Sequence, residues 1–425
     1  MSEPATAGAA TEPLVEPSLT GPTLADFEDA RQRVTPVLEV TPMQTSQFLT
    51  DLLGALVLLK CENLQRTGSY KIRGAYNRIS RLTDEEKARG VVAASAGNHA
   101  QGVAFAAREL GIRSTIFMPL GVALPKLQAT RNYGAEVVLV GHTVQEPLLA
   151  AAEFAERTGA VFIHPFDHPD VVAGQGTLGL DVYDEVPDLA TVVVPIGGGG
   201  LISGVASAIR QRAAAAGRQV RIIGVQAANA AAYPVSLDRG APTEITVLPT
   251  IADGIAVGKP GVLNFDIVRD AVDEIVTVTD DQIATAVLTL IERAKLVVEP
   301  AGAVGVAAIM AGLVSPNGTT VLLLTGGNID PLMMERIISH GLAASERYLK
   351  LRIPLPDRPG QLARVSALVA ECNANVVEVL HTRHHGGLLI SQVELELHIE
   401  TRGPEHADQV ITRLRDDGFE PRVDF

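Results

Sequence analysis

Short apolar runs, each followed by a segment long enough for a helix, recur along the chain and constrain its fold more than any other feature. Such runs indicate buried parallel strands, because a strand covered by helices on both faces is apolar at every position. Helices are expected between the runs, for example over Val103–Leu110 and Ala206–Ala216. We therefore predict an α/β body with a doubly wound sheet in two lobes. The predicted strands are Ala55–Leu59, Gly90–Ala94, Ser114–Met118, Glu136–Val140, Val161–His164, Thr191–Pro195, Arg221–Val225 and Thr320–Leu324.

The pattern changes after about residue 345. An alternating run at Leu349–Ile353 is followed by the turn Asp357–Gly360 and a helix over Gln361–Val369. Two more alternating runs, a second helix and a short last strand complete the order βαββαβ, which is typical of a ferredoxin-like sandwich. The runs are Val376–His384 and Leu388–Glu400, and the second helix is Glu405–Arg415.

These patterns divide the chain into four parts. Residues 1–22 are rich in Ala, Pro, Glu, Thr and Gly and are expected to be a mobile tail. The α/β body is expected over residues 23–342, with its smaller lobe at about 58–157. A linker at 343–347 leads to the small domain at 348–425.

The composition excludes several classes of function. A formal net charge of −14 argues against a nucleic-acid partner, because phosphate backbones are bound by cationic surfaces. No run of about 18 apolar residues occurs, so no membrane span is expected, and no secretory signal is visible at the N-terminus. Cys61 and Cys372 lie far apart, which matches no metal-binding spacing and favours a reduced, cytoplasmic compartment.

Four consecutive glycines follow the strand TVVVPI and precede a helix that opens near Leu201. Glycine lets the backbone wrap an oxyanion, and a helix N-terminus offers unpaired N–H groups. The pattern therefore predicts a phosphate cradle, with a tight strand-to-helix turn as the simpler alternative. No Gly-Lys-Ser/Thr motif follows, and the next strand ends at Gln226 rather than at an acid, so a small phosphorylated cofactor fits better than a nucleotide or dinucleotide.

Two other turns follow predicted strands. In SAGNHAQG (Ser95–Gly102), Ser95 is a candidate helix cap and Asn98 can donate or accept a hydrogen bond. Thr325 stands at the carboxyl end of a strand, where open α/β sheets bind ligands. A capped helix and an ordinary turn are the alternatives without a ligand. His99 has no visible Ser and Asp partners, so a catalytic triad is not predicted.

The segment QRTGSYKIRGA (Gln65–Ala75) places Lys71 between an aromatic ring and an isoleucine, among hydroxyls and glycines. A lysine that is desolvated in such a setting has a lowered pKa and can form a Schiff base or act as a base. A surface lysine that extends its amine into water is the alternative. A phosphate cradle together with a Schiff-base lysine indicates pyridoxal phosphate.

With these motifs, residues 24 to about 342 resemble the threonine dehydratase (threonine ammonia-lyase) branch of the fold type II pyridoxal-phosphate enzymes, which share a tryptophan synthase β-like fold. The C-terminal segment resembles an ACT regulatory domain, with Asp357 and Gly360 in its Asp-x-x-Gly turn. The matching motifs are ENLQRTGSYKIRGA (Glu62–Ala75), SAGNHAQG, AGQGT (Ala173–Thr177), the glycine run, ADGIAV (Ala252–Val257), EPAGAVG (Glu299–Gly305) and TGGNID (Thr325–Asp330).

The resemblance implies roles for individual residues. Lys71 would be the Schiff-base lysine and the base that removes the Cα proton of L-threonine, and of L-serine, to give 2-oxobutanoate or pyruvate and ammonia. Tyr70 would pack near the cofactor ring, Asn98 would meet its 3′-oxygen and Thr325 its pyridine nitrogen. Gly254 and Glu299 would line the site. The implied phosphate ligands are Gly197, Gly198, Gly199, Gly200 and Leu201, and the implied substrate-carboxylate ligands are Ser95, Ala96, Asn98 and His99.

Two other functions stay open at this point. Serine racemases of the same family carry a serine as second base where this chain has Ala96, which favours the dehydratase. A non-catalytic, amino-acid-sensing ACT protein is disfavoured by the intact Lys71 and glycine run. The resemblance also implies a homodimer or homotetramer with an amino-acid effector at the ACT domain. The ACT-like tail suggests isoleucine biosynthesis, whereas the QRTGS and TGGNID motifs look nearer the degradative enzymes. No metal site is predicted, because Gln226 replaces the acid of metal-binding relatives.

Overall fold

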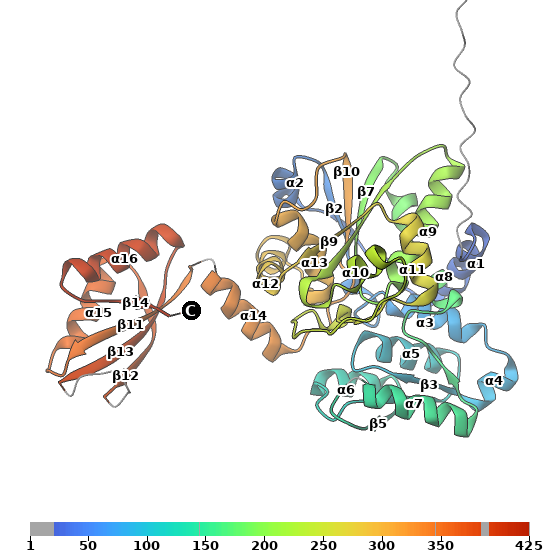
Figure 1. Cartoon of the computed structure of the whole chain (residues 1–425), viewed down its shortest axis with the longest axis horizontal. Helices are drawn as coiled ribbons and strands as arrows, with labels where there is room; N and C mark the ends of the chain where they lie inside the picture. Colours follow the sequence, from blue (N-terminus) through green and yellow to red (C-terminus); the bar gives the residue numbers. More distant parts are fainter. Residues whose placement is uncertain (1–20, 144, 345, 384–390, 425) are drawn as a thin grey trace, which may run out of the picture.

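The computed structural model describes residues 21–143, 145–344, 346–383 and 391–424. The mobile tail that the sequence predicts at residues 1–22 lies almost entirely outside the described residues. Figure 1 shows a large α/β body and a smaller C-terminal body, with helix α14 (Pro331–Ala344) between them. The two lobes of the large body each contain one sheet, and the sheets are not joined by strand pairing.

The larger sheet has six strands in the order β1-β2-β10-β7-β8-β9. All neighbouring strands are parallel except β1, which runs antiparallel to β2 at the edge of the sheet. The strands are β1 (Met43–Thr45), β2 (Val57–Lys60), β7 (Leu189–Pro195), β8 (Arg221–Ala227), β9 (Glu274–Val278) and β10 (Thr319–Leu323).

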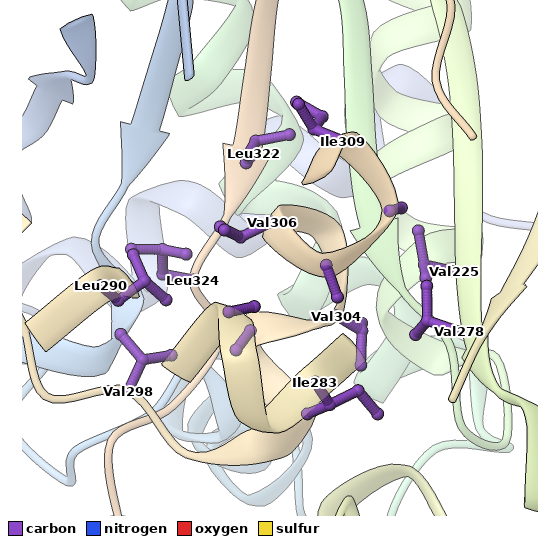
Figure 2. Packing of buried hydrophobic residues seen from close by; sticks show 14 of the residues in the cluster. Val225, Val278, Ile283, Leu290, Val298, Val304, Val306, Ile309, Leu322 and Leu324 are labelled. Carbon is purple, nitrogen blue, oxygen red and sulfur yellow. The ribbon is translucent and has the colours of Figure 1, made fainter. Parts of the chain in front are cut away.

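Both faces of this sheet are covered by helices, as the continuous apolar strands predict. Val192 and Val194 of β7 pack with α8 and α9, whereas Val193 between them faces the cluster formed with α12 and α13. Figure 2 shows the second cluster, where Leu322 of β10 and Val225 of β8 lie close to the helix that carries Val304 and Val306. The helices are α8 (Pro169–Glu185), α9 (Gly200–Ala215), α12 (Asp280–Thr289) and α13 (Pro300–Met310).

The smaller sheet has four parallel strands in the order β5-β4-β3-β6. Helices α3 and α5 share one apolar cluster with this sheet, and α7 packs on the opposite side. The elements of this lobe are α3 (Lys71–Ser80), α4 (Asp84–Arg89), β3 (Val91–Ala94), α5 (Asn98–Glu109), β4 (Ser114–Met118), α6 (Leu124–Asn132), β5 (Glu136–Leu139), α7 (Gln145–Thr158) and β6 (Val161–Phe162).

The α/β body has the predicted architecture, and each of the eight predicted strands is present within a few residues. The structure corrects the expected limits of the smaller lobe, about 58–157. Strand β2 belongs to the larger sheet, and β6 belongs to the smaller one. Strands β1 and β9 were not predicted, because β1 is short and polar and β9 is an edge strand whose pattern is interrupted by Thr277. Sheet membership depends on pairing between distant segments, which local hydrophobicity does not encode.

The remaining helices of the body complete its two outer layers. Helices α1, α4 and α12 start after Thr23, Thr83 and Thr279, whose hydroxyls accept a hydrogen bond from the N–H three residues on. The helices not yet given are α1 (Leu24–Val34), α2 (Gln47–Leu53), α10 (Ala232–Arg239) and α11 (Val262–Ala271), with a π-helical turn at Leu290–Ala294 and short 3₁₀ turns at Thr35–Val37, Glu62–Leu64, Ala228–Ala230 and Asp253–Ile255.

The C-terminal body has the element order βαββαβ that the sequence predicts. Its antiparallel sheet has the order β12-β13-β11-β14, and its apolar core is made entirely of residues from 349 to 419. Part of the predicted run Leu388–Glu400 lies outside the described residues, and α14 extends through Ala344 into the expected linker. The elements are β11 (Tyr348–Pro356), α15 (Gln361–Glu371), β12 (Asn375–Thr382), β13 (Gln392–Glu400), α16 (Pro404–Asp416) and β14 (Arg422–Val423).

Candidate active site

A cavity of about 800 Å³ lies between the two lobes. Its walls come from the carboxyl ends of strands in both sheets, which is where open α/β sheets place their ligands. The end of β3 and the segments that follow β3, β6, β7 and β10 contribute Ala94–His99, His164–Phe166, Gly197–Leu201 and Thr325. All four segments lie at or beyond the ends of predicted strands, and those after β3, β7 and β10 are candidate ligand-binding turns in the sequence. They meet at one cavity.

Lys71 is the first residue of α3 and lines this cavity. Its Nζ donates to the carbonyl of Pro165 at 3.0 Å and lies 5.4 Å from the ring centroid of Tyr70. The N–H of Tyr70 donates to the carbonyl of Thr325 at 3.1 Å, so the lysine is held beside the end of β10. Burial of the amine lowers the pKa of Lys71 to about 8, although the nearby Glu299 carboxylate acts in the opposite direction. Lys71 is therefore not the surface lysine of the alternative interpretation.

A buried ion network holds α3 in place two residues beyond Lys71. The guanidinium of Arg73 donates to both carboxylate oxygens of Glu62 at 2.9 Å, and also to Asp181 at 2.7 Å and Thr177 at 3.0 Å. Arg73 and Glu62 are almost fully buried, and the hydroxyl of Thr41 donates to the same carboxylate. The network joins α3 to α8 and to the turn before Lys71. The sequence places Arg73 in a motif but does not reveal this contact, because Asp181 is more than a hundred residues away.

The glycine run forms a tight turn that enters α9. Gly199 has φ = +102°, which favours glycine, and α9 begins at Gly200. A Cβ on Gly198 would lie 2.5 Å from the ring of Phe166, and one on Gly199 would lie 1.8 Å from the hydroxyl oxygen of Tyr233. The N–H groups of the first helical turn have no acceptor within the helix. A turn without side chains, opening on unpaired N–H groups beside a cavity, fits a bound phosphate.

A chain of polar side chains forms another wall of the cavity. Asn98 donates to Glu299 at 2.6 Å and accepts from Asn328 at 2.9 Å, and Asn328 also donates to the carbonyl of Thr67. Burial, together with the charge of Asp253, raises the pKa of Glu299 to about 7, while Lys126 and the hydrogen bond from Asn98 lower it. Asn98 lines the cavity, and its amide is oriented by two partners that are distant in the sequence.

In SAGNHAQG, Ser95 differs from the expectation, whereas His99, for which no catalytic triad is predicted, makes a contact inside the fold. Helix α5 begins at Asn98 and its N-cap is Gly97, which has no side chain, so Ser95 is not the cap. The Ser95 hydroxyl instead accepts from the N–H of Gly97 at 3.1 Å. His99 is buried, its Nε2 faces the carbonyl of Ile163 at 2.8 Å, and burial lowers its pKa to about 3. The lowered pKa keeps His99 neutral near pH 7, and its Nε2–H is used inside the fold.

Several cavity residues were not predicted. Lys126 forms an ion pair with Asp253 at 2.7 Å, linking α6 of the smaller lobe to the 3₁₀ turn at Asp253–Ile255. His164 and Phe166 follow β6, and the Nδ1 of His164 accepts from the N–H of Asp167 at 2.7 Å. The position of His164 at the end of a predicted strand was the available signal. Lys126 had none, because its helix has no distinctive motif.

Of the other predicted positions, some line the cavity and others lie outside it. Gly254 and Ala96 line the cavity, and Thr325 lines it with only 3 % of its surface exposed. Asp357 and Gly360 lie in the C-terminal body, where Gly360 (φ = +91°) caps α15, and they are not part of the cavity. Among the described residues, no group of three or more His, Cys, Asp or Glu side chains is arranged to hold a metal ion. No helix in the same part of the chain is long and apolar enough to cross a membrane.

Comparison with known proteins decides which cofactor the cavity takes. A family model described as "Pyridoxal-phosphate dependent enzyme" matches residues 34–326, which include Lys71, the glycine run and Thr325. The chain belongs to the pyridoxal-phosphate dependent enzymes. The side-chain-free cradle and the desolvated amine of Lys71 suit such a cofactor, which carries a phosphate and an aldehyde.

Individual members of the pyridoxal-phosphate dependent enzymes are similar over different lengths. L-threonine ammonia-lyase of Geobacter sulfurreducens is 48 % identical over 394 residues, 92 % of this chain and 97 % of that protein. The catabolic L-threonine dehydratase TdcB of Escherichia coli K12 is 44 % identical over 308 residues, 72 % of this chain and 92 % of that protein. The structure of threonine deaminase isoform 2 from Solanum lycopersicum matches with a TM-score of 0.70 at 34 % identity, covering 77 % of this chain and 98 % of that one. Maize serine racemase matches with a TM-score of 0.68 at 33 % identity, covering 76 % and 98 %.

Proposed function

We propose that this pyridoxal-phosphate dependent enzyme is a threonine ammonia-lyase that also accepts L-serine. Water is eliminated from the amino acid, and the released enamine then takes up water and loses ammonia. The net products are 2-oxobutanoate and ammonia from threonine, or pyruvate and ammonia from serine. The observation that carries the proposal is that the amine of Lys71 and the glycine cradle line one cavity, in a chain that is 48 % identical to an L-threonine ammonia-lyase over nearly its full length.

Lys71 has the properties needed to bind the aldehyde and then to move a proton. When bound, the cofactor would supply an aldehyde that reacts with amines and a ring that stabilises negative charge at the substrate Cα. With a pKa of about 8, a useful fraction of Lys71 is a neutral amine near neutral pH and can accept the Cα proton. Its position at the first turn of α3, fixed by the Arg73 network, keeps the amine at the cavity wall.

The other cavity residues have roles that follow from their chemistry. The N–H groups of Gly198, Gly199, Gly200 and Leu201 would bind the phosphate at the N-terminus of α9, and Gly197 would let the backbone approach it. Thr325 offers the ring nitrogen a hydroxyl, which does not hold the ring protonated as a carboxylate would. The N-terminus of α5, with Ser95, Ala96, Asn98 and His99 around it, would receive the substrate carboxylate. Tyr70 would pack near the cofactor ring, and Gly254 and Glu299 would line its other side.

Ala96 distinguishes elimination from racemisation. Racemisation needs a proton-transferring group on each face of Cα, and Lys71 supplies one face only. Ala96 lines the cavity and has no proton to transfer, and the low pKa and internal hydrogen bond of His99 remove that residue as a substitute. These features favour elimination, although maize serine racemase has a similar structure.

A substrate panel tests the proposal. Purified protein with pyridoxal phosphate is incubated with L-threonine, L-serine and D-serine, and keto acid and enantiomer are measured together. Keto acid is expected from both L-amino acids, with L-threonine the better substrate. Rapid epimerisation of L-serine without matching pyruvate would instead identify a racemase, and the absence of turnover by cofactor-loaded protein would favour the sensing function.

The C-terminal body is proposed to be an ACT regulatory domain that binds an amino-acid effector near the turn Asp357–Gly360. Support comes from its βαββαβ order and from the G. sulfurreducens relative, whose alignment over 394 residues must extend into this region, whereas that of the E. coli catabolic enzyme covers 308 residues. Homodimeric or homotetrameric assembly and a cytoplasmic location are part of the same proposal. Titration of activity with isoleucine, valine and AMP separates a biosynthetic from a degradative role, because feedback by isoleucine or valine belongs to the first.

A further inference from the structure

The carbonyl oxygen of Gly198, in the middle of the glycine run, accepts three hydrogen bonds. The N–H of Gly261 donates to it at 3.0 Å, the Nδ2 of Asn264 at 3.2 Å and the hydroxyl of Tyr233 at 3.3 Å. The donors come from α10 and from the start of α11, and both side chains are fully buried. A single turn carbonyl rarely needs three donors, so its orientation is strongly determined.

The three donors lie on the side of the glycine run away from the cavity. Gly197–Leu201 line the cavity, whereas Tyr233, Gly261 and Asn264 are not among its lining residues in the described part of the chain. In a trans peptide the C=O and the N–H point in opposite directions. Pulling the Gly198 oxygen toward Tyr233 and Asn264 therefore turns the N–H of Gly199 toward the cavity. Gly199 permits this orientation because its φ of +102° is available to glycine.

The donors are themselves held in place by further contacts. The N–H of Tyr233 donates to Gln226 at 3.0 Å, and the Nδ2 of Asn264 also donates to the carbonyl of Phe166 at 3.1 Å. The carboxylate of Asp167 accepts from the N–H groups of Val262 and Leu263, which anchors the first turn of α11 beside the glycine run.

We propose that Tyr233 and Asn264 are positioning residues for the phosphate of the cofactor. They hold the Gly198 carbonyl at the rear of the cradle, so that its partial negative charge faces away from the anion and the N–H of Gly199 faces toward it. The proposal rests on the assignment of the glycine run to the phosphate, and it concerns residues that no sequence motif identifies. Its chemical signature is a loss of affinity that depends on the phosphate group.

The test compares two ligands that differ only in that group. Full-length wild type and Tyr233→Phe are equilibrated by dialysis against graded pyridoxal phosphate or pyridoxal, and bound ligand is measured by visible absorbance. Tyr233→Phe removes one hydrogen bond and is expected to weaken the binding of pyridoxal phosphate about 3- to 10-fold, whereas the affinity for pyridoxal should change by less than about twofold. Asn264→Ala removes a second donor to the same oxygen and should show the same selectivity for the phosphate-bearing ligand.

Tyr183→Phe is the matched control. Tyr183 is also buried, on α8, and its hydroxyl has no hydrogen-bond partner among the described residues, so its loss should change neither affinity. An unchanged affinity of Tyr233→Phe for pyridoxal phosphate, or an equal loss for both ligands, would overturn the positioning role while leaving the cradle assignment intact. A wild type that binds pyridoxal as tightly as pyridoxal phosphate would overturn both.

Discussion

The chemistry of this protein depends on a few residues whose surroundings differ from those of ordinary surface groups. Lys71 combines a carbonyl partner, an aromatic neighbour and a desolvated amine, and the result is a pKa of about 8. Glu299, which lines the same cavity, has a pKa raised to about 7 by burial. Two titratable groups in one cavity whose pKa values are both shifted toward 7 are typical of an active site.

Lys71→Ala tests the role of this amine. The variant should lose turnover by about 10³-fold or more, because the general base and the covalent attachment point are lost together. Borohydride reduction of wild type should fix pyridoxal phosphate on the protein, and reduction of the variant should not. Circular dichroism checks that the variant is folded. Activity retained near the wild-type level would refute the assignment.

The pKa of Lys71 makes activity depend on pH in a defined direction. Covalent uptake of pyridoxal phosphate needs the neutral amine, so its rate should rise with pH through about 8 and level off above it. Glu299→Gln removes a charge that stabilises the protonated lysine, so the midpoint should move to lower pH. Stopped-flow absorbance measures both midpoints, with Glu274→Gln on the edge strand β9 as the control. An unchanged or higher midpoint in Glu299→Gln would show that the carboxylate does not act on Lys71.

At the scale of elements, the site depends on how α3 is attached to the larger lobe. The helix that starts at Lys71 belongs to the smaller lobe by its packing, yet Arg73 ties it to α8 and to Glu62 before the helix. A buried charge pair with complete hydrogen bonding determines one arrangement of its surroundings, because any displacement leaves a charge unpaired. The amine of Lys71 is thereby kept close to both the glycine cradle and Thr325.

Breaking this network should destabilise the body far more than breaking a surface pair. Arg73→Met leaves Glu62 buried without its partner, and we expect a loss of about 3–5 kcal/mol of unfolding free energy. Arg33→Met, which removes a half-exposed pair with Asp29, should cost about 0–1 kcal/mol. Urea denaturation followed by circular dichroism gives both values. Equal effects for the two variants would mean that the Arg73 network does not hold the helix.

At the scale of the whole molecule, the cavity and the core of the C-terminal body are built from different residues. Every residue that lines the cavity precedes residue 330, and the C-terminal core contains no residue of the α/β body. The junction consists of α14, which packs on α12 with a hydrogen bond between His340 and Asp281 at 2.7 Å, and of an ion pair between Arg347 and Glu292. Glu292 lies in the π-helical turn that precedes Glu299, so the junction is close in sequence to the active site.

A chain that ends after Ala344 tests this separation. It keeps α14 and should retain threonine turnover within roughly threefold of the full chain, because a body with its own core folds independently. Its response to isoleucine, valine or AMP should disappear if the effector binds the C-terminal body. Steady-state rates with and without each effector are the measurement, and gel filtration shows whether assembly has changed. A folded but inactive truncated chain would show that the C-terminal body completes the active site.

The sequence by itself determined the class of the fold and the chemically distinctive groups. These are local features, set by backbone geometry and side-chain chemistry within a few residues. They are the continuous apolar runs of a length typical of parallel strands, the glycine run, and Lys71 in its motif. Only the tertiary structure decided which distant groups meet. It brought Asn98 to Glu299, Lys71 to Pro165, His99 to Ile163 and Tyr233 to Gly198. It also placed β2 in the larger sheet and β6 in the smaller one, and it showed that Ser95 is not a helix cap. These outcomes depend on strand order and on packing between segments far apart in the chain, and no local pattern specifies them.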